Sequence, residues 1–435
     1  MRTIKKHSLS DLEMLKPKIL NWAQQYEEVI WLDGNDYPQK EQNYRAVLAI
    51  DAFTALKTDA YKGFDKLREY QSTAKDWVFG YLTYDLKNDV ENLNSQNSDE
   101  LDFPDLYFFQ PKKVFLFSED FVEVQYLNMV ADEIESDWVS ILENNSFENN
   151  SFENNSFENK IEIQNRTSKK EYIEKVNKAL EYIKRGDIYE VNLCQEFYAE
   201  TTTIDPLPTF LQLNEISKPP FSAFLKLNEF FALSASPERY IKKTGTRVIS
   251  QPIKGTAKRS KNNEEDLELA KQLANDPKER SENIMITDLV RNDLSKFAEK
   301  GSVQVEELCG VYSFKQVHQL ISTIICEVSP SSESVDIIRN TFPMGSMTGA
   351  PKVSAMKIIE EIEDAKRGLY SGAIGYFSPN GDFDFNVVIR SILYNSLIEY
   401  VSFSVGGAIT TNSIPEKEYE ECMLKAKAMR QVLNR

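Results

Sequence analysis

Residues 372–394, GAIGYFSPNGDFDFNVVIRSILY, limit the folds that this chain can adopt. Two alternating runs flank Asn380-Gly381, a dipeptide that favours a type I′ turn, so the segment predicts an antiparallel hairpin. Further strand-like segments, 230–236 and 247–253, lie close together along the chain. Strands arranged in hairpins and meanders indicate an α+β protein with large, mainly antiparallel sheets, and argue against a doubly wound fold.

Helical signals also occur. Ser168 and Glu171 form a capping box, and with Gly186 as a stop they predict an amphipathic helix between them. The next segment, DIYEVNLCQEFY, alternates, so Asn192 and Glu190 lie on the more polar face of a strand. Other helices are expected at residues 263–275, 278–294, 351–364 and 415–433.

The clearest boundary is a run in which ENNSF is repeated three times, from Glu143 to Phe157. Such a polar tract buries too little apolar surface to offset its ordering entropy, so it predicts a surface loop or linker. We therefore expect an N-terminal region at 1–140, a low-complexity loop at 141–165, and a domain with most of the candidate chemistry at 166–435.

The net charge excludes some functions. With 51 basic and 68 acidic residues the formal charge is −17, which disfavours nucleic acid as a partner. No apolar stretch is long enough to span a bilayer, and the N-terminus shows no secretory signal, so the cytosol is the expected location. The four cysteines are widely spaced, which favours buried thiols over disulfides or zinc.

Two glutamate pairs have helical spacing. Glu279 and Glu282 are three residues apart, as are Glu418 and Glu421, so each pair places two carboxylates on one helix face. Two such faces together would suit magnesium, which prefers oxygen ligands. Each pair taken alone is equally typical of a solvated helix, with Glu421 and Lys425 as a surface ion pair.

Four further segments have two readings each. Lys254 follows a strand and is either a solvated turn lysine or a nucleophile, which would need its pKa lowered by roughly 2–3 units. Arg390 is either a carboxylate clamp or part of an internal ion pair. The segment MGSMTGAPK is either an anion-binding turn or a plain helix entry. His318 reads more readily as a core histidine than as a general base.

Together these segments resemble the chorismate-utilising enzymes. That family includes anthranilate synthase component I, aminodeoxychorismate synthase component I, isochorismate synthase and salicylate synthase. The resemblance is strong over about residues 166–432 and weaker before residue 140, and it makes 166–435 a chorismate-binding catalytic domain. It rests on these motifs in family order: SASPERY (234–240), QPIKGTAKRS (251–260), ERSENIMITDLVRND (279–293), FPMGSMTGAPK (342–352), YSGAIGY (370–376), VVIRSI (387–392), GGAIT (406–410) and EYEECMLKAKA (418–428).

Two positions indicate the branch. Asn192 stands where the hydrating members carry a lysine base, so the resemblance implies ammonia as the nucleophile. Lys254 stands where the members that form anthranilate have alanine and those that aminate carbon 4 have lysine. The resemblance therefore favours 4-amino-4-deoxychorismate, a precursor of p-aminobenzoate and folate, as the product, with anthranilate as the alternative.

The resemblance also implies roles for individual residues. Lys254 would attack carbon 2 of the ring and Glu238 would protonate the departing hydroxyl. Glu282 and Glu421 would bind magnesium directly, and Glu279 and Glu418 through water or by ordering the other two; the magnesium would bind the ring carboxylate of chorismate. The substrate-binding residues would be Arg390, Lys425, Tyr370, Gly406, Gly407, Asn192, Thr348 and His318. The implied fold is a pair of antiparallel sheets packed face to face, with helices outside and the site between them.

Two further implications concern ligands and partners. The chain has no G-x-C-x-G motif for glutamine hydrolysis, so ammonia would come from a separate glutamine amidotransferase subunit. VIWLDGND stands roughly where anthranilate synthases carry a motif for tryptophan feedback. Asp33, Phe221 and Ser222 are therefore a candidate tryptophan pocket.

Overall fold

The computed structural model describes residues 1–435 except 10, 38–40, 42, 145–160 and 435. The part before the ENNSF tract forms the strands β1 (Arg2–Ser8), β2 (Glu28–Asp33), β3 (Ala46–Thr58), β4 (Val78–Leu82), β5 (Leu106–Phe117) and β6 (Phe121–Leu127). Its helices are α1 (Leu12–Ala23), α2 (Gly63–Ala74), α3 (Lys87–Val90) and α4 (Ile134–Glu143).

The part after the tract contributes most of the strands. These are β7 (Gln164–Asn165), β8 (Glu190–Ala199), β9 (Phe221–Leu227), β10 (Phe230–Ser236), β11 (Arg239–Thr244), β12 (Arg247–Gln251), β13 (Ile253–Lys258), β14 (Gln304–Ser313), β15 (Val317–Glu327), β16 (Gly349–Ala350), β17 (Ala373–Phe377), β18 (Phe383–Asn386), β19 (Ser391–Asn395) and β20 (Tyr400–Thr410). Its helices are α5 (Lys169–Arg185), α6 (Pro206–Ser217), α7 (Asn263–Asn275), α8 (Pro277–Ser295), α9 (Ser334–Thr341), α10 (Lys352–Ile362) and α11 (Pro415–Leu433).

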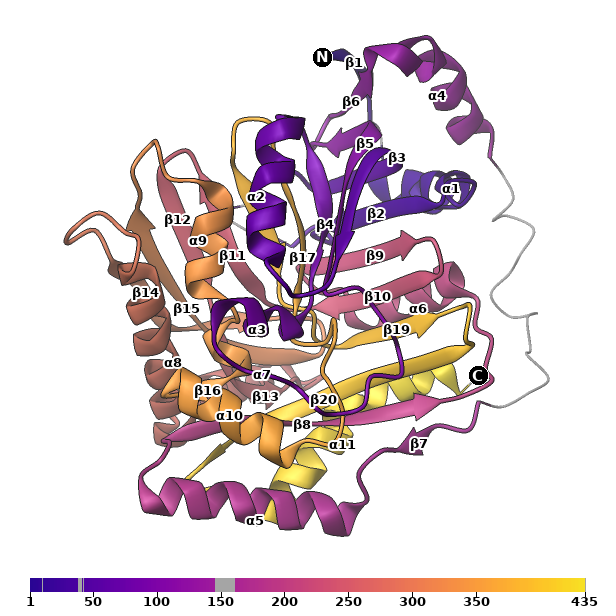
Figure 1. Cartoon of the computed structure of the whole chain (residues 1–435). Helices are drawn as coiled ribbons and strands as arrows, with labels where there is room; N and C mark the ends of the chain where they lie inside the picture. The colour runs from indigo at the N-terminus through magenta and orange to yellow at the C-terminus, as the bar shows by residue number, and fades with distance from the viewer. Residues whose placement is uncertain (10, 38–40, 42, 145–160, 435) are drawn as a thin grey trace.

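The described strands pair into one continuous antiparallel sheet that bends at β5 into two parts, the first and the second sheet, and β7 and β16 both pair with β8. The first sheet runs β8–β20–β19–β10–β9–β2–β3–β5–β6–β1, and the second runs β5–β4–β17–β18–β11–β12–β15, with β13 and β14 both paired to β15 (Figure 1). Within β5, residues 113–117 pair with β6 while residues 106–109 pair with β4, so this strand forms the corner between the sheets. The α+β class with large antiparallel sheets is confirmed.

Alternation along single strands builds two cores. On β2, Ile30 joins a cluster of residues from both sheets, whereas Val29 and Trp31 join a second cluster that includes residues of the helices α1, α5, α6 and α11. Successive side chains of a strand point to opposite faces, so one strand serves both cores. Outside the sheets, α6 and α11 contact β10 and β20, while α8 contacts β13 and β15.

The predicted elements agree with the structure except in two details. Ser168 caps α5 with Glu171 as expected, and Gly186 ends it at φ +84°. The hairpin of β17 and β18 is present, but its turn is a five-residue loop, 378–382, in which Gly381 and not Asn380 has positive φ, so the predicted type I′ turn is wrong. Arg390 also has φ +54° and lies between β18 and β19, so residues 383–392 are not one strand.

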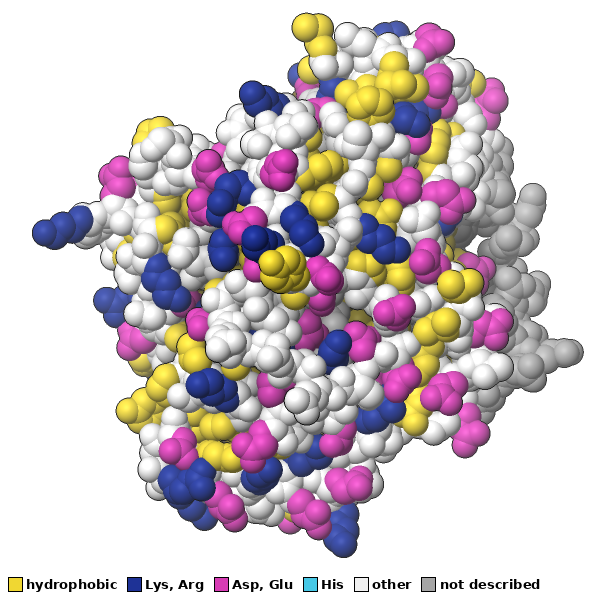
Figure 2. Space-filling view, viewed as in Figure 1, with side chains coloured by type: hydrophobic (Ala, Val, Ile, Leu, Met, Phe, Trp, Pro, Cys, Tyr) yellow, Lys and Arg dark blue, Asp and Glu magenta, His cyan; other side chains and the backbone are white. Residues whose placement is uncertain are grey.

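The expected loop lies mostly outside the described residues. Of positions 141–165, residues 141–143 belong to α4 and residues 164–165 to β7. The described part contains no helix long and apolar enough to cross a membrane. All four cysteines are buried and free, as predicted. On the face shown in Figure 2, acidic and basic side chains are intermixed, so the net charge forms no single-sign patch there.

Candidate active site

Lys254 and Glu190 form a buried ion pair between elements of the two sheets. Nζ of Lys254 lies 3.0 Å from Oε1 of Glu190, and the two side chains are 10% and 1% exposed. Lys254 lies at a register shift between β13 and β15, and its carbonyl accepts a hydrogen bond from the Asn283 amide on α8. Such an irregularity re-aims a side chain relative to a regular strand.

The position of Glu190 depends on a glycine. Strand β16 pairs with the start of β8, with Gly349 opposite Val191. Gly349 has φ +149°, and a Cβ there would lie 2.2 Å from the Glu190 carbonyl oxygen. Only glycine allows this approach. In FPMGSMTGAPK this glycine therefore secures the contact between β16 and β8.

The charge state of Lys254 differs from what a free nucleophile needs. Burial lowers its pKa, but Glu190 and then Glu282 and Glu238 raise it, and the net shift is upward. A nucleophilic role for Lys254 was expected to require a lowered pKa of its amine. The upward shift in this structure does not meet that requirement. The buried carboxylates stabilise the ammonium form, and the amine must pass its proton to another group before it can attack.

In contrast to Lys254, Glu238 has a pKa shift that suits the role expected for it. Its side chain is 4% exposed, in the connection between β10 and β11. Burial raises the pKa of Glu238 to about 7, although Ser346 and Lys254 act against this shift. A carboxyl group with this pKa can hold a proton at neutral pH and donate it, as a general acid must.

The two glutamate pairs of α8 and α11 lie close enough to influence one another electrostatically. Glu421 is among the groups that raise the pKa of both Glu279 and Glu418, after burial, and burial raises the pKa of Glu282 to about 7. The four carboxylates thus influence one another, which two separate solvated helices would not allow. Lys278, on α8, lies 3.8 Å from Glu282, too far for a hydrogen bond.

These residues fit a magnesium ion chemically. Among the described residues, no three His, Cys, Asp or Glu side chains form a ready-made metal cluster. Magnesium does not need one, because it binds through one or two carboxylates and keeps several waters or substrate oxygens. Oε1 of Glu282 is buried without a hydrogen-bond partner in the described structure, which suits a cation as its missing partner.

The two cationic side chains expected to bind substrate, Lys425 and Arg390, differ in their ion pairing. Nζ of Lys425 is 2.7 Å from Glu421 and donates to the carbonyl oxygen of Gly406 at 2.8 Å. Arg390 has no ion pair within the described residues, and burial lowers its pKa, although Tyr370 and Glu421 act against that shift. Arg390 is half-buried, and a guanidinium without a carboxylate partner is well suited to bind a substrate carboxylate. The internal ion pair considered for Arg390 is therefore not observed.

Residues of β20 and β8 lie next to these side chains and pack closely against one another. A Cβ at Gly406 would lie 2.5 Å from Cys194 Sγ, whereas one at Gly407 would meet its nearest atom, Oε2 of Glu418, at 3.5 Å. Asn192 is buried, and its amide donates to the Ser346 carbonyl at 3.1 Å. Thr348 is fully buried and accepts at its carbonyl from the Asn192 backbone N–H.

The structure does not bring His318 into contact with these groups. Its Nδ1 lies 2.7 Å from Ser313 Oγ, and its Nε2 lies 3.1 Å from Asp266. The ring is 1% exposed, so it matches a hydrogen-bonded core histidine. Its predicted role in substrate binding stays a prediction.

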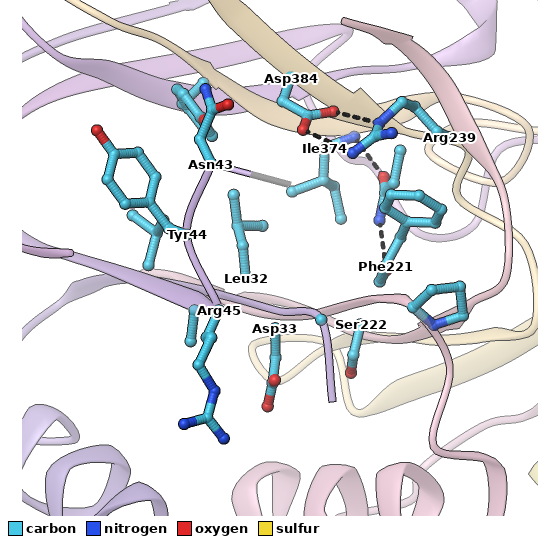
Figure 3. A pocket seen from close by; sticks show the side chains of 16 residues that line it. Leu32, Asp33, Asn43, Tyr44, Arg45, Phe221, Ser222, Arg239, Ile374 and Asp384 are labelled. Carbon is cyan, nitrogen blue, oxygen red and sulfur yellow. Dashed lines mark hydrogen bonds and ion pairs between the residues drawn. The ribbon is translucent and has the colours of Figure 1, made fainter. Parts of the chain in front are cut away.

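Asp33, Phe221 and Ser222 line one pocket together with Arg239 and Asp384 (Figure 3). Asp33 and Ser222 point the same way, and the Asp33 carboxylate is bound by Lys16 at 2.7 Å. The cavity measures about 70 Å³, roughly half of a 150 Å³ cavity that holds benzene. An indole ring would require its walls to move, and tryptophan binding stays a prediction.

Two buried features were not predicted. Glu190 was placed on the polar strand face with Asn192 but received no role. Arg367 pairs with Glu363 at 2.7 Å and donates to the carbonyl oxygens of Asn192 and Met347. Strand alternation was the only signal for Glu190, and nothing in the sequence indicated the Arg367 contacts.

The site thus contains a lysine amine paired with a carboxylate, a carboxyl group with a raised pKa, four further glutamates and two cationic side chains. The model of the family described as chorismate binding enzyme matches residues 19–431, and the chain belongs to this family. It is 43% identical to aminodeoxychorismate synthase component 1 of Escherichia coli K12, over 59% of this chain and 56% of that protein. It is also 33% identical to aminodeoxychorismate synthase component 1 of Bacillus subtilis 168, over 88% of this chain and 80% of that protein.

Anthranilate synthases are similar too. The component 1 of Thermus thermophilus is 34% identical over 81% of this chain and 76% of that protein. The crystal structure of anthranilate synthase component I from Streptococcus pneumoniae superimposes with a TM-score of 0.76 at 26% identity, covering 91% of this chain and 93% of the other. The family predicted from the sequence is confirmed. The E. coli alignment spans only about half of that relative.

Proposed function

We propose that this chain is the aminating component of an aminodeoxychorismate synthase and converts chorismate and ammonia to 4-amino-4-deoxychorismate. The observation that carries the proposal is the largely buried Lys254 amine, whose side chain is 10% exposed, paired with Glu190 and influenced by Glu238. A solvated turn lysine would be exposed, whereas this one is held inside the site. Two relatives with the same named activity support the same reading.

The proposed reaction consists of two displacements. Glu238 gives its proton to the hydroxyl at carbon 4, which leaves as water while the neutral Lys254 amine bonds to carbon 2 and the ring double bonds shift. Ammonia then bonds to carbon 4, the double bonds shift back, and the bond to Lys254 breaks with its electron pair returning to nitrogen. Arg390 and Lys425 bind the substrate carboxylates.

The acidic residues have a supporting role in the proposal. Glu282 and Glu421, helped by Glu279 and Glu418, would hold magnesium, which supplies positive charge opposite the ring carboxylate. The local cations and this ion would allow a protein of net charge −17 to bind a dianion.

The product identifies the reaction. The purified chain, chorismate, magnesium and an ammonium salt should give 4-amino-4-deoxychorismate, detected by chromatography and mass. Anthranilate with an equal amount of pyruvate would instead assign the chain to the alternative, which the similarity to anthranilate synthases supports. Lys254, which that branch replaces with alanine according to the sequence resemblance, favours the first product.

The source of ammonia is a further part of the proposal. The chain lacks a G-x-C-x-G motif, and its relatives are named as component 1, which supports a separate glutamine amidotransferase as partner. The cytosolic location expected from the sequence stays a prediction.

A further inference from the structure

Glu190 is a buried carboxylate for which the reaction above has no use. It is the first residue of β8, is 0% exposed, and faces Lys254 at 3.0 Å through Oε1. Both of its carboxylate oxygens are buried and lack a hydrogen-bond partner among the described residues, so the 3.0 Å contact with Lys254 is an ion pair without hydrogen-bond geometry. A buried carboxylate in this state is costly unless it serves a function or is fully paired.

We propose that Glu190 is a further catalytic residue, the base that takes the proton of the Lys254 ammonium group and so releases the amine for attack on the ring. The inference rests on the proposed function, because it assigns a role to Lys254 as nucleophile. The geometry supports it, because Oε1 of the carboxylate lies 3.0 Å from the nitrogen that must lose a proton, and a small side-chain rotation would align the two atoms for direct transfer.

The proton balance closes over one turnover. The Lys254 ammonium gives one proton to Glu190, and its neutral amine bonds to carbon 2 while Glu238 gives a proton to the leaving hydroxyl. When ammonia displaces the lysine, Lys254 leaves as a neutral amine and takes its proton back from Glu190. The new ammonium group at carbon 4 returns a proton to Glu238, so the net reaction releases water only.

The two carboxylates have different surroundings, as acid and base require. Burial raises the pKa of Glu238 to about 7, so that it can hold a proton near neutral pH, whereas Glu190 is paired with the lysine cation. Such separation of roles by environment is common in active sites. The charged groups facing Lys254 are Glu190 of β8, Glu238 before β11, Glu282 of α8 and Glu421 of α11.

The test measures formation of the covalent adduct between Lys254 and chorismate without ammonia, by rapid quench and intact mass, at saturating magnesium. In Glu190→Gln we expect adduct formation at pH 6 to be slower by about 10²–10⁴-fold. In this variant the Lys254 ammonium group must lose its proton to water, so the neutral amine becomes more abundant as the pH rises. The rate of adduct formation should therefore rise about tenfold per pH unit between pH 6 and 7. The unmodified protein should show no such rise, since its proton transfer is internal.

Glu196→Gln is the matched control. Glu196 lies on the same strand and pairs with Arg166 at 2.9 Å, so the variant removes the same charge from a different ion pair. It should keep the wild-type rate. A Glu190→Gln rate equal to or above wild type would show that Glu190 only holds the lysine charged, and would overturn the inference.

Two outcomes separate this inference from the proposed function. No adduct in the unmodified protein would remove the Lys254 intermediate, and both proposals with it. An adduct whose rate in the unmodified protein rises about tenfold from pH 6 to 7 would keep the proposed function and refute the role of Glu190. This second measurement needs no variant, so it decides the matter even if Glu190→Gln fails to fold.

Discussion

Glu238 is the residue whose environment makes the clearest pH prediction. Burial raises the pKa of Glu238 to about 7, and the proposed acid acts only when protonated. At a constant concentration of free ammonia, the rate should therefore fall about tenfold per pH unit above pH 7. Glu238→Gln should lose about 10²–10⁴-fold in kcat and show no decline of this kind. Steady-state rates between pH 6 and 9 test this, and a rate that keeps rising would contradict it.

At the scale of residues, the sequence motifs singled out Lys254 but did not indicate the charge state that its surroundings favour. The motif containing Lys254 could be read from the sequence, but the sequence argument required a lowered pKa for its amine. In the structure Glu190, Glu282 and Glu238, which come from three separate parts of the fold, instead raise the pKa of Lys254. Their convergence on one nitrogen depends on tertiary structure, which no spacing along the chain contains.

At the scale of elements, the glutamates of α8 and α11 predict a metal requirement. Glu282→Gln or Glu421→Gln should abolish turnover and the increase in melting temperature on adding magnesium, because each removes a proposed ligand. Glu279→Gln and Glu418→Gln should weaken magnesium binding by about 10–100-fold. Glu420→Gln, an exposed position on α11, is the control and should behave as wild type. Normal magnesium binding in Glu282→Gln and Glu421→Gln would refute this assignment.

Strand β20 gives a prediction about stability. A Cβ at Gly406 would clash with Cys194 Sγ at 2.5 Å and with the Leu193 carbonyl at 2.7 Å, so Gly406→Ala must push β20 from β8. We expect a loss of about 1–3 kcal/mol in unfolding free energy. Gly407→Ala, next in the strand, meets nothing closer than 3.5 Å and should keep the wild-type value. Denaturant unfolding measures both, and equal stabilities would contradict the steric argument.

Local signals predicted most elements, while irregular backbone escaped them. The capping box at Ser168 and the glycine at 186 located α5 because both act within a few residues. The break at residues 387–390 was missed because Arg390 has positive φ, which its side chain does not favour and only tertiary contacts can hold. That break places Arg390 beside the groups of α11 and not on a regular strand face.

At the scale of the whole molecule, the N-terminal region is part of the catalytic body. Strands β2 and β4 pair with β9 and β17, so removing residues 1–165 would expose two strand edges and the core between the sheets. Exposed edges and apolar faces promote aggregation. The fragment 166–435 should therefore be insoluble or aggregated when expressed alone. A monomeric, cooperatively unfolding fragment, shown by light scattering and calorimetry, would disprove this expectation.

The pH dependence of the whole reaction should reveal the separate ammonia source. With a fixed amount of ammonium salt, rising pH increases free ammonia while Glu238 loses its proton, so the two effects offset each other above about pH 7. With glutamine and an amidotransferase subunit, ammonia comes from glutamine, so its supply does not increase as the pH rises. The glutamine-dependent rate should then decline above about pH 7 where the ammonium-dependent rate stays level. The chain alone should form no product from glutamine, and glutamine turnover without a partner would refute the two-component reading.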